Sequence, residues 1–129
     1  MTQGKYKNKR PVFLHLLKIR LPVGGIVSIT HRVTGVLLTL ILPFALYFLT
    51  LSLENEAGFD TATRVLQQPI TRVFVLLVFW FFAQHFFSGL RHLVMDLDIA
   101  MEKSAARLSA WLVFALSLLM TGWFGVCWL

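Results

Sequence analysis

The chain reads His-Phe-Phe-Ser-Gly-Leu-Arg-His-Leu-Val-Met-Asp from His85 to Asp96, inside the second of three long apolar segments. On a helix at 100° per residue, His85, Ser88, Gly89, His92 and Asp96 fall in one narrow stripe, opposite an apolar side. Titratable side chains are costly in hydrocarbon, so the stripe is expected to face protein, a cofactor or a water-filled pocket. Gly89 removes bulk between the two histidines and leaves room for a flat group. The stripe is therefore interpreted as the wall of a cofactor site.

The composition indicates a membrane protein. The chain has 129 residues, of which 57% are hydrophobic and only 14% are charged, and this departs from ordinary soluble domains. At this length we expect one domain covering residues 1–129. The net charge of +6 does not indicate nucleic acid as a partner. Half of the Lys and Arg residues lie in the first twenty positions, which is typical of a cytoplasmic flank beside a first membrane span.

We predict an all-α membrane protein with a cytoplasmic N-terminus and three transmembrane helices, over approximately residues 26–53, 70–97 and 108–129. The uncharged core of the first span is long enough for a bilayer core of ~30 Å. Residues 12–20 are amphipathic and basic, which predicts a short interfacial helix. The chain retains Met1 and shows no cleavable signal. We therefore expect the bacterial inner (cytoplasmic) membrane, with the mitochondrial inner membrane as the less favoured location.

The segments between and within the spans carry further signals. Pro22, Gly24 and Gly25 are expected to interrupt the chain before the first span. Asp60 is expected to cap a short surface helix over 61–68 in the outer loop, and 98–107 is expected to form the inner loop. In the third span, the small residues Ser117, Thr121 and Gly125 recur every four positions, which predicts close packing against another helix.

His85 is the candidate axial ligand of a b-type haem in the membrane. His92 lies roughly 10 Å away along the same helix, so the two histidines cannot share one iron. His31 is expected well above His85, at the cytoplasmic end. The chain then offers one axial histidine, and the second ligand comes from another subunit or the iron is five-coordinate. Without haem, His85 is a hydrogen-bonded interhelical histidine. The single cysteine, Cys127, and the lack of a CxxCH motif exclude covalent haem attachment.

A second polar face includes Ser28, His31 and Arg32 at the start of the first span. On one interpretation these residues cap the helix and carry a snorkelling arginine. On the other, Arg32 pairs haem propionates together with His31 or His92, and Ser28 and Arg32 hydrogen-bond a quinone carbonyl close to proton-supplying water.

Arg91 and Asp96 are candidates for a supporting role. Their i,i+5 offset is poor for a mutual pair, so each is expected to meet a partner elsewhere. The sequence holds no G-x-S-x-G motif, no P-loop and no dinucleotide fingerprint. We therefore expect no catalysis by this chain alone.

Two runs of sequence resemble the signatures of the cytochrome b556 subunits of succinate dehydrogenase. The first is Arg10-Pro11-Val12, then Leu16, then Ser-Ile-Thr-His-Arg-Val-Thr-Gly over 28–35. The second is the run from His85 to Asp96. The resemblance covers nearly the whole chain, and the two runs occur in the order of that family.

The resemblance implies one of two small membrane anchors of succinate:quinone oxidoreductase. Its partners would be a second membrane-anchor subunit, an iron–sulfur subunit and a flavoprotein subunit, with electrons passing from succinate to ubiquinone. His85 matches the family's ligand to haem b, which the second anchor shares. Ser28 and Arg32 match its quinone-site residues, and His31 and Arg32 match positions near the haem propionates.

Three other functions remain open from the sequence. One is a fumarate reductase anchor that uses menaquinone. Another is a haem-free anchor or assembly protein in which His85 is structural. The last is a small transporter with Arg32, Arg91 and Asp96 as a relay, although this leaves the two signature runs unexplained.

Overall fold

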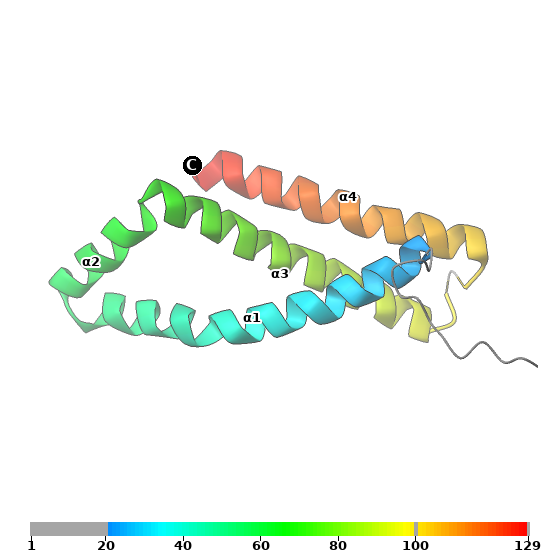
Figure 1. The fold of residues 1–129 in the computed structure, drawn as a ribbon, viewed down its shortest axis with the longest axis horizontal. Helices are drawn as coiled ribbons and strands as arrows, with labels where there is room; N and C mark the ends of the chain where they lie inside the picture. The colour runs from blue at the N-terminus through cyan, green and yellow to red at the C-terminus, as the bar shows by residue number, and fades with distance from the viewer. Residues whose placement is uncertain (1–20, 100, 129) are drawn as a thin grey trace, which may run out of the picture.

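The computed structural model describes residues 21–99 and 101–128. Within these residues the chain is helical and has no strand. Its four helices are α1 (Val23–Glu54), α2 (Glu56–Leu66), α3 (Pro69–Asp96) and α4 (Lys103–Trp128), shown in Figure 1. The predicted all-helical fold is confirmed.

Helix α3 lies between α1 and α4 and packs against both (Figure 1). The short helix α2 joins α1 to α3 at one end of the molecule, and the turn before α4 lies at the other end. Helices α1, α3 and α4 are each long and apolar enough to cross a membrane, which confirms three candidate spans. The interfacial helix expected over 12–20 lies outside the described residues.

Helix α1 begins earlier than the sequence indicated. The prediction that Gly24 and Gly25 interrupt the chain is wrong, because both lie in the first turn of α1 after the N-cap Pro22. The carbonyl of Pro22 accepts hydrogen bonds from the N–H groups of Gly25 (2.8 Å) and Ile26 (3.2 Å). A proline is tolerated at this helix end because its missing N–H needs no intrahelical partner.

Helix α2 is also longer than predicted, and its cap is a different residue. Asn55 has extended backbone angles, and its side-chain oxygen accepts a hydrogen bond from the N–H of Gly58 at 2.8 Å. An asparagine in this position satisfies one of the free N–H groups of the first turn. The expected cap by Asp60 is therefore wrong, since Asp60 lies inside the helix.

The predicted inner loop is shorter in the structure. Residues 103–107, which were expected to be loop, form the first turn of α4, because nothing in Lys-Ser-Ala-Ala-Arg breaks a helix. The turn itself reverses the chain soon after Asp96. Asp98 takes a positive φ of 58° there, a conformation that aspartate tolerates better than most residues.

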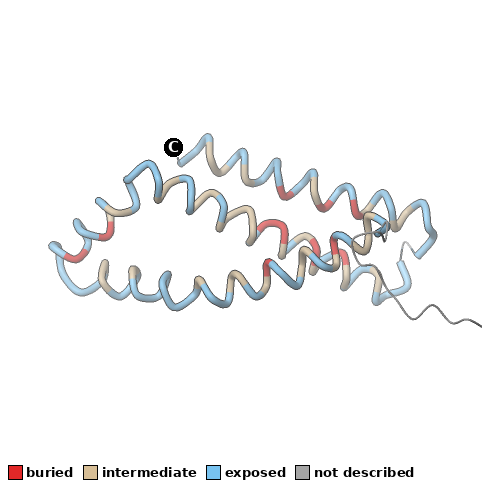
Figure 2. Tube along the Cα trace, in the orientation of Figure 1, coloured by how far each residue is buried: buried red, intermediate tan, exposed pale blue. Residues whose placement is uncertain are grey.

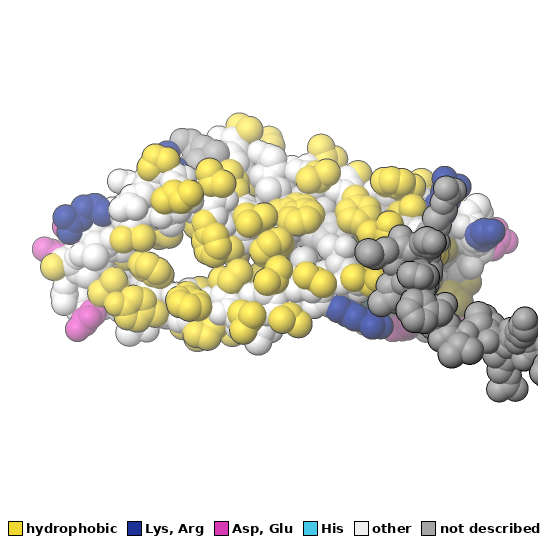
Figure 3. All heavy atoms as spheres, viewed as in Figure 1, with side chains coloured by type: hydrophobic (Ala, Val, Ile, Leu, Met, Phe, Trp, Pro, Cys, Tyr) yellow, Lys and Arg dark blue, Asp and Glu magenta, His cyan; other side chains and the backbone are white. Residues whose placement is uncertain are grey.

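The surface of the described chain is that of a protein surrounded by hydrocarbon. Buried positions gather along α3 and where the three long helices meet, whereas the half of α1 near α2 is exposed (Figure 2). Large apolar side chains such as Leu40, Phe44 and Tyr47 are more than 60% exposed. On the face in Figure 3, hydrophobic side chains cover most of the length and charged ones gather toward the ends. Such a surface suits lipid or a membrane partner.

Small and polar residues hold α4 against α3. Ser117 is fully buried and donates a hydrogen bond of 2.7 Å to Oε1 of Gln84, whose amide donates at 3.3 Å to the hydroxyl of Ser88. Gly125 packs closely on Leu76, since an added Cβ would lie 3.3 Å from its side chain. The predicted small-residue packing of the third span is confirmed at Ser117 and Gly125.

The Gln84–Ser117 hydrogen bond is expected to stabilise the pairing of α3 and α4 modestly. Hydrogen bonds between membrane helices contribute about 0.6 kcal/mol on average in double-mutant cycles. Gln84→Leu and Ser117→Ala should each lower the melting temperature of the detergent-purified complex. The double variant should lose less than the sum of the two. Strictly additive losses would show that the two side chains do not interact.

Candidate functional site

The three histidines of the described chain come together where α1 crosses α3. The rings of His31 and His85 stack with centroids 4.2 Å apart and an interplanar angle of 12°. The ring of His92 lies 5.3 Å from that of His31, tilted by 59°. The expectation that His31 lies well above His85 is therefore wrong.

The starting point of α1 explains this correction. Because the helix begins at Val23, His31 lies about 12 Å inside it, and His85 lies about 16 Å before the end of the antiparallel α3. The side chains bridge the small remaining difference in depth. The sequence-based prediction began this span near residue 26, later than the Val23 start of α1, and therefore placed His31 too near the end.

Two glycines allow the helices to approach closely at this crossing. A Cβ at Gly35 of α1 would lie 2.9 Å from Cε1 of His85. A Cβ at Gly89 of α3 would lie 3.3 Å from Nε2 of His31. Each histidine ring thus packs over a glycine of the opposite helix, which is the kind of close approach that glycine permits. Gly89 was expected to leave room for a flat group, and in the structure the ring of His31 lies over it.

A backbone contact fixes the tautomer of His85. Its Nδ1 lies 3.0 Å from the carbonyl oxygen of His31. A carbonyl oxygen can only accept a hydrogen bond, so Nδ1 carries the proton in a neutral ring. The lone pair is then on Nε2, the arrangement found where a histidine ligates a metal through Nε2 and is oriented through Nδ1.

The polar stripe expected on α3 divides into two faces. His85, Gly89 and His92 lie toward α1, but Ser88 is fully buried on the α4 side, in the hydrogen-bonded group with Gln84. Asp96 is exposed at the last residue of α3. Ser88 and His85 lie close together in angle around the axis of α3. Because α4 packs against the side of α3 that carries Ser88, Ser88 does not face the same site as His85.

His31 and His85 border a hollow of 470 Å³ on the surface of the α1–α3 pair. Its volume lies within the range of about 300–1,000 Å³ found for ligand sites. Arg32 lines it beside His31, Gly35 and His85 and is exposed on the surface of this chain. Ser28 is half-buried one turn before Arg32 and does not line the hollow.

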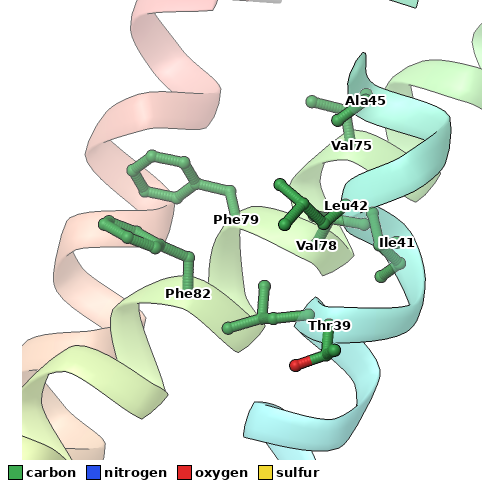
Figure 4. A pocket seen from close by; sticks show the side chains of 9 residues that line it. Thr39, Ile41, Leu42, Ala45, Val75, Val78, Phe79 and Phe82 are labelled. Carbon is green, nitrogen blue, oxygen red and sulfur yellow. The ribbon is translucent and has the colours of Figure 1, made fainter. Parts of the chain in front are cut away.

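An apolar hollow of 510 Å³ adjoins this one, since Thr39 lines both. It lies between residues 38–45 of α1 and 75–82 of α3, and Figure 4 shows Leu42, Val78 and Phe82 among the side chains that surround it. Its lining is almost wholly hydrocarbon. The two hollows together offer a polar end at the histidines and an apolar end along the diverging helices.

Arg91 is buried, with 8% of its surface exposed, and contacts α4 rather than the histidines. Its Nε donates to the hydroxyl of Ser109 at 3.0 Å and its Nη2 donates to the carbonyl of Ala106 at 3.2 Å. A Cβ at Gly24 would lie 3.3 Å from the same Nη2. Arg91 therefore contacts the beginning of α1 and the start of α4 from the end of α3. As expected, its hydrogen-bond partners do not include Asp96.

The donor set around the hollow suits a group held by a single ligand. Among residues 21–99 and 101–128, no three His, Cys, Asp or Glu side chains are arranged to hold a metal ion. The stacked rings of His31 and His85 cannot both direct a nitrogen at one metal between them, because each lone pair lies in its ring plane. One histidine, a nearby arginine and an apolar wall fit a non-covalently bound haem, since histidine can ligate its iron and arginine can pair with its propionates.

Two buried residues with roles here escaped the sequence-based prediction. Thr34 is 1% exposed and lies beside Nδ1 of His85, and Gln84 is fully buried against Ser117. Both are uncharged, so they do not interrupt an apolar segment as His or Arg does. The signal that could have found Gln84 is the cost of an amide in hydrocarbon, which requires a partner.

Comparisons with known proteins agree on one family. The profile of the succinate dehydrogenase/fumarate reductase transmembrane subunit matches residues 6–124. The succinate dehydrogenase cytochrome b556 subunit of Coxiella burnetii is 34% identical over 113 residues, covering 84% of this chain and 88% of that protein. The cytochrome b560 subunit of Reclinomonas americana is 35% identical over 119 residues, covering 87% of this chain and 81% of that protein.

The b556 subunit of Paracoccus denitrificans is similar at 27% identity, covering 88% of each chain. The matches cover 81–88% of the length of these three relatives. The chain therefore belongs to the succinate dehydrogenase/fumarate reductase transmembrane subunit family, and it is a subunit of such an enzyme complex rather than an enzyme on its own.

Proposed function

We propose that this chain is a membrane anchor of succinate:quinone oxidoreductase that helps bind haem b and forms part of the ubiquinone reduction site. The observation that carries the proposal is the hydrogen bond from Nδ1 of His85 to the carbonyl of His31, which leaves the lone pair of Nε2 available to a metal. The family supports the anchor role, and the names of the relatives support a cytochrome b.

For haem, this chain would supply one ligand and part of the wall. His85 would ligate through Nε2, and Gly35 gives its ring the space it occupies. Arg32, His31 and His92 are the cationic or donor groups available to the propionates. When bound, a b-type haem supplies one-electron transfer within the membrane. Within the described residues His85 alone would ligate the iron, and a further ligand would come from a second anchor subunit.

For ubiquinone, Ser28 and Arg32 supply hydrogen bonds at the same end of α1. They lie one turn apart on one face, and Arg32 lines the hollow beside the histidines. A quinone carbonyl that gains electrons becomes negative, so a guanidinium beside it stabilises the reduced form and favours electron uptake. The flavoprotein and iron–sulfur subunits deliver the electrons from succinate.

The proposal includes the setting of the subunit. The whole chain acts as one anchor domain in the bacterial inner membrane, with its N-terminus and the Arg91–Asp96 end of α3 on the cytoplasmic side. The basic first twenty residues support this orientation by the positive-inside rule. Fumarate reductase belongs to the same family, but the relatives described above are named for succinate dehydrogenase, which favours the succinate-oxidising direction.

Ser28→Ala is expected to raise the apparent KM for ubiquinone about three- to tenfold. The reason is the loss of one neutral hydrogen bond, which is worth about 0.5–1.5 kcal/mol. The measurement is quinone-reductase kinetics of the purified complex against quinone concentration, with haem content as the assembly control. Ser52→Ala, at the other end of α1, should leave the KM unchanged. An unaltered KM in Ser28→Ala would remove this residue from the quinone site.

A further inference from the structure

Thr34 lies beside Nδ1 of the His85 ring. It is 1% exposed, on α1, one turn after Thr30. Its Oγ1 lies 2.8 Å from the carbonyl of Thr30, 3.0 Å from the carbonyl of His31 and 3.4 Å from Nδ1 of His85. The hydroxyl therefore shares the position next to Nδ1 with the His31 carbonyl.

The hydrogens in this group can be assigned from the acceptors present. A threonine hydroxyl has one hydrogen, and both carbonyls near Oγ1 can only accept. The hydroxyl therefore donates to one of them, with Thr30 as the shorter contact, and directs its lone pairs elsewhere. Nδ1–H of His85 then has two acceptors, the His31 carbonyl at 3.0 Å and the Thr34 hydroxyl at 3.4 Å.

We propose that Thr34 is a positioning residue for His85, and that its hydroxyl lowers the reduction potential of a haem iron ligated by His85. This inference rests on the proposed function, since it requires His85 to be the ligand. Hydrogen bonds accepted from the second nitrogen of a ligating histidine hold its orientation and raise its basicity. A more basic ligand stabilises the oxidised iron over the reduced iron, so each added acceptor at Nδ1 lowers the potential.

The burial of the group increases its effect. Thr34 is 1% exposed, and electrostatic effects are stronger in such low-dielectric surroundings. Thr50 offers a matched comparison on the same helix. Its hydroxyl also donates to the carbonyl four residues before it, at 2.9 Å, but it is exposed and far along α1 from His85.

The test is a potentiometric titration of haem b in the complete membrane complex carrying Thr34→Val, Thr34→Ser or Thr50→Val. Valine keeps the shape of threonine and removes the hydroxyl, so the midpoint potential should rise by more than the scatter between replicate titrations. The electron paramagnetic resonance signal of the oxidised haem should shift with it. Thr34→Ser should restore the wild-type values, and Thr50→Val should not alter them.

An unchanged potential in Thr34→Val, with haem still bound through His85, would overturn this inference and leave the proposed function intact. A potential that rises equally in Thr34→Val and Thr34→Ser would also overturn it, because the hydroxyl would then not be the cause. Thr34→Ala carries the same expectation as valine if the valine complex does not assemble. A haem that persists unaltered in His85→Ala would instead refute the proposed function.

Discussion

Arg32→Leu is expected to lower ubiquinone reduction by the complete complex about 10- to 100-fold, while succinate oxidation by a soluble artificial acceptor persists. Arg32 is the cation that lines the hollow beside His31 and His85. A hydrogen bond to a charged group is worth about 1.5–3 kcal/mol, which corresponds to this loss if the guanidinium stabilises the quinone as it becomes reduced. Succinate oxidation takes place in other subunits, so the soluble acceptor bypasses the lesion.

The two activities are measured on the same membranes and compared as a ratio. Arg64→Leu serves as the matched control, because Arg64 is an exposed arginine on α2, far from the histidines, and its loss should leave the ratio unchanged. Arg32→Lys should recover only part of the activity, since an ammonium keeps the charge but not the planar fork of donors. A parallel fall of both activities in Arg32→Leu would show that Arg32 serves assembly and not the quinone.

His85→Ala is expected to remove haem b from the complex almost completely. A haem without a covalent link depends on its ligands and on packing, and truncation of His85 removes the ligand and opens space beside Gly35. The measurement is the haem content per flavin of the purified complex. Phe86→Ala removes a similar volume from the next position of α3, but its side chain is 52% exposed. This control should retain its haem.

The haem content of His85→Ala also distinguishes between two proposed functions, an anchor that binds haem and an anchor that does not. If His85 is only an interhelical contact, the alanine variant should keep its cofactor content and lose only stability. Retention of the full haem content in His85→Ala would therefore contradict the proposal.

The sequence was sufficient for the fold class and the three candidate spans, whereas ligation by His85 stays a prediction. Long apolar runs can satisfy their backbone only as helices in hydrocarbon, and strong signals such as His or Arg within them mark the polar face. The first residues of the helices were harder to predict from the sequence. Pro22, Gly24 and Gly25 are a local signal for a break, yet α1 continues through both glycines. The close approach of Arg91 to Gly24 could not be seen from the sequence alone.

The arrangement within the site depended on packing that one helix alone does not reveal. Ser88 and His85 are close in helical angle, but α4 covers one and α1 covers the other. The stacking of His31 on His85 depends on the depth at which α1 crosses α3, which the two glycines permit. The uncharged Thr34 gave no signal in the sequence, because its importance comes from a neighbour on another helix.

The most direct test of the central claim is a dithionite-reduced minus oxidised spectrum of membranes that contain this chain with its partner subunits, for wild type and His85→Gly, without and with added imidazole. The account predicts a b-type α-band in wild type, its loss in His85→Gly, and its return when imidazole occupies the space left by the side chain. A His85→Gly band unchanged in position and height would contradict it, because the haem would then be held without His85.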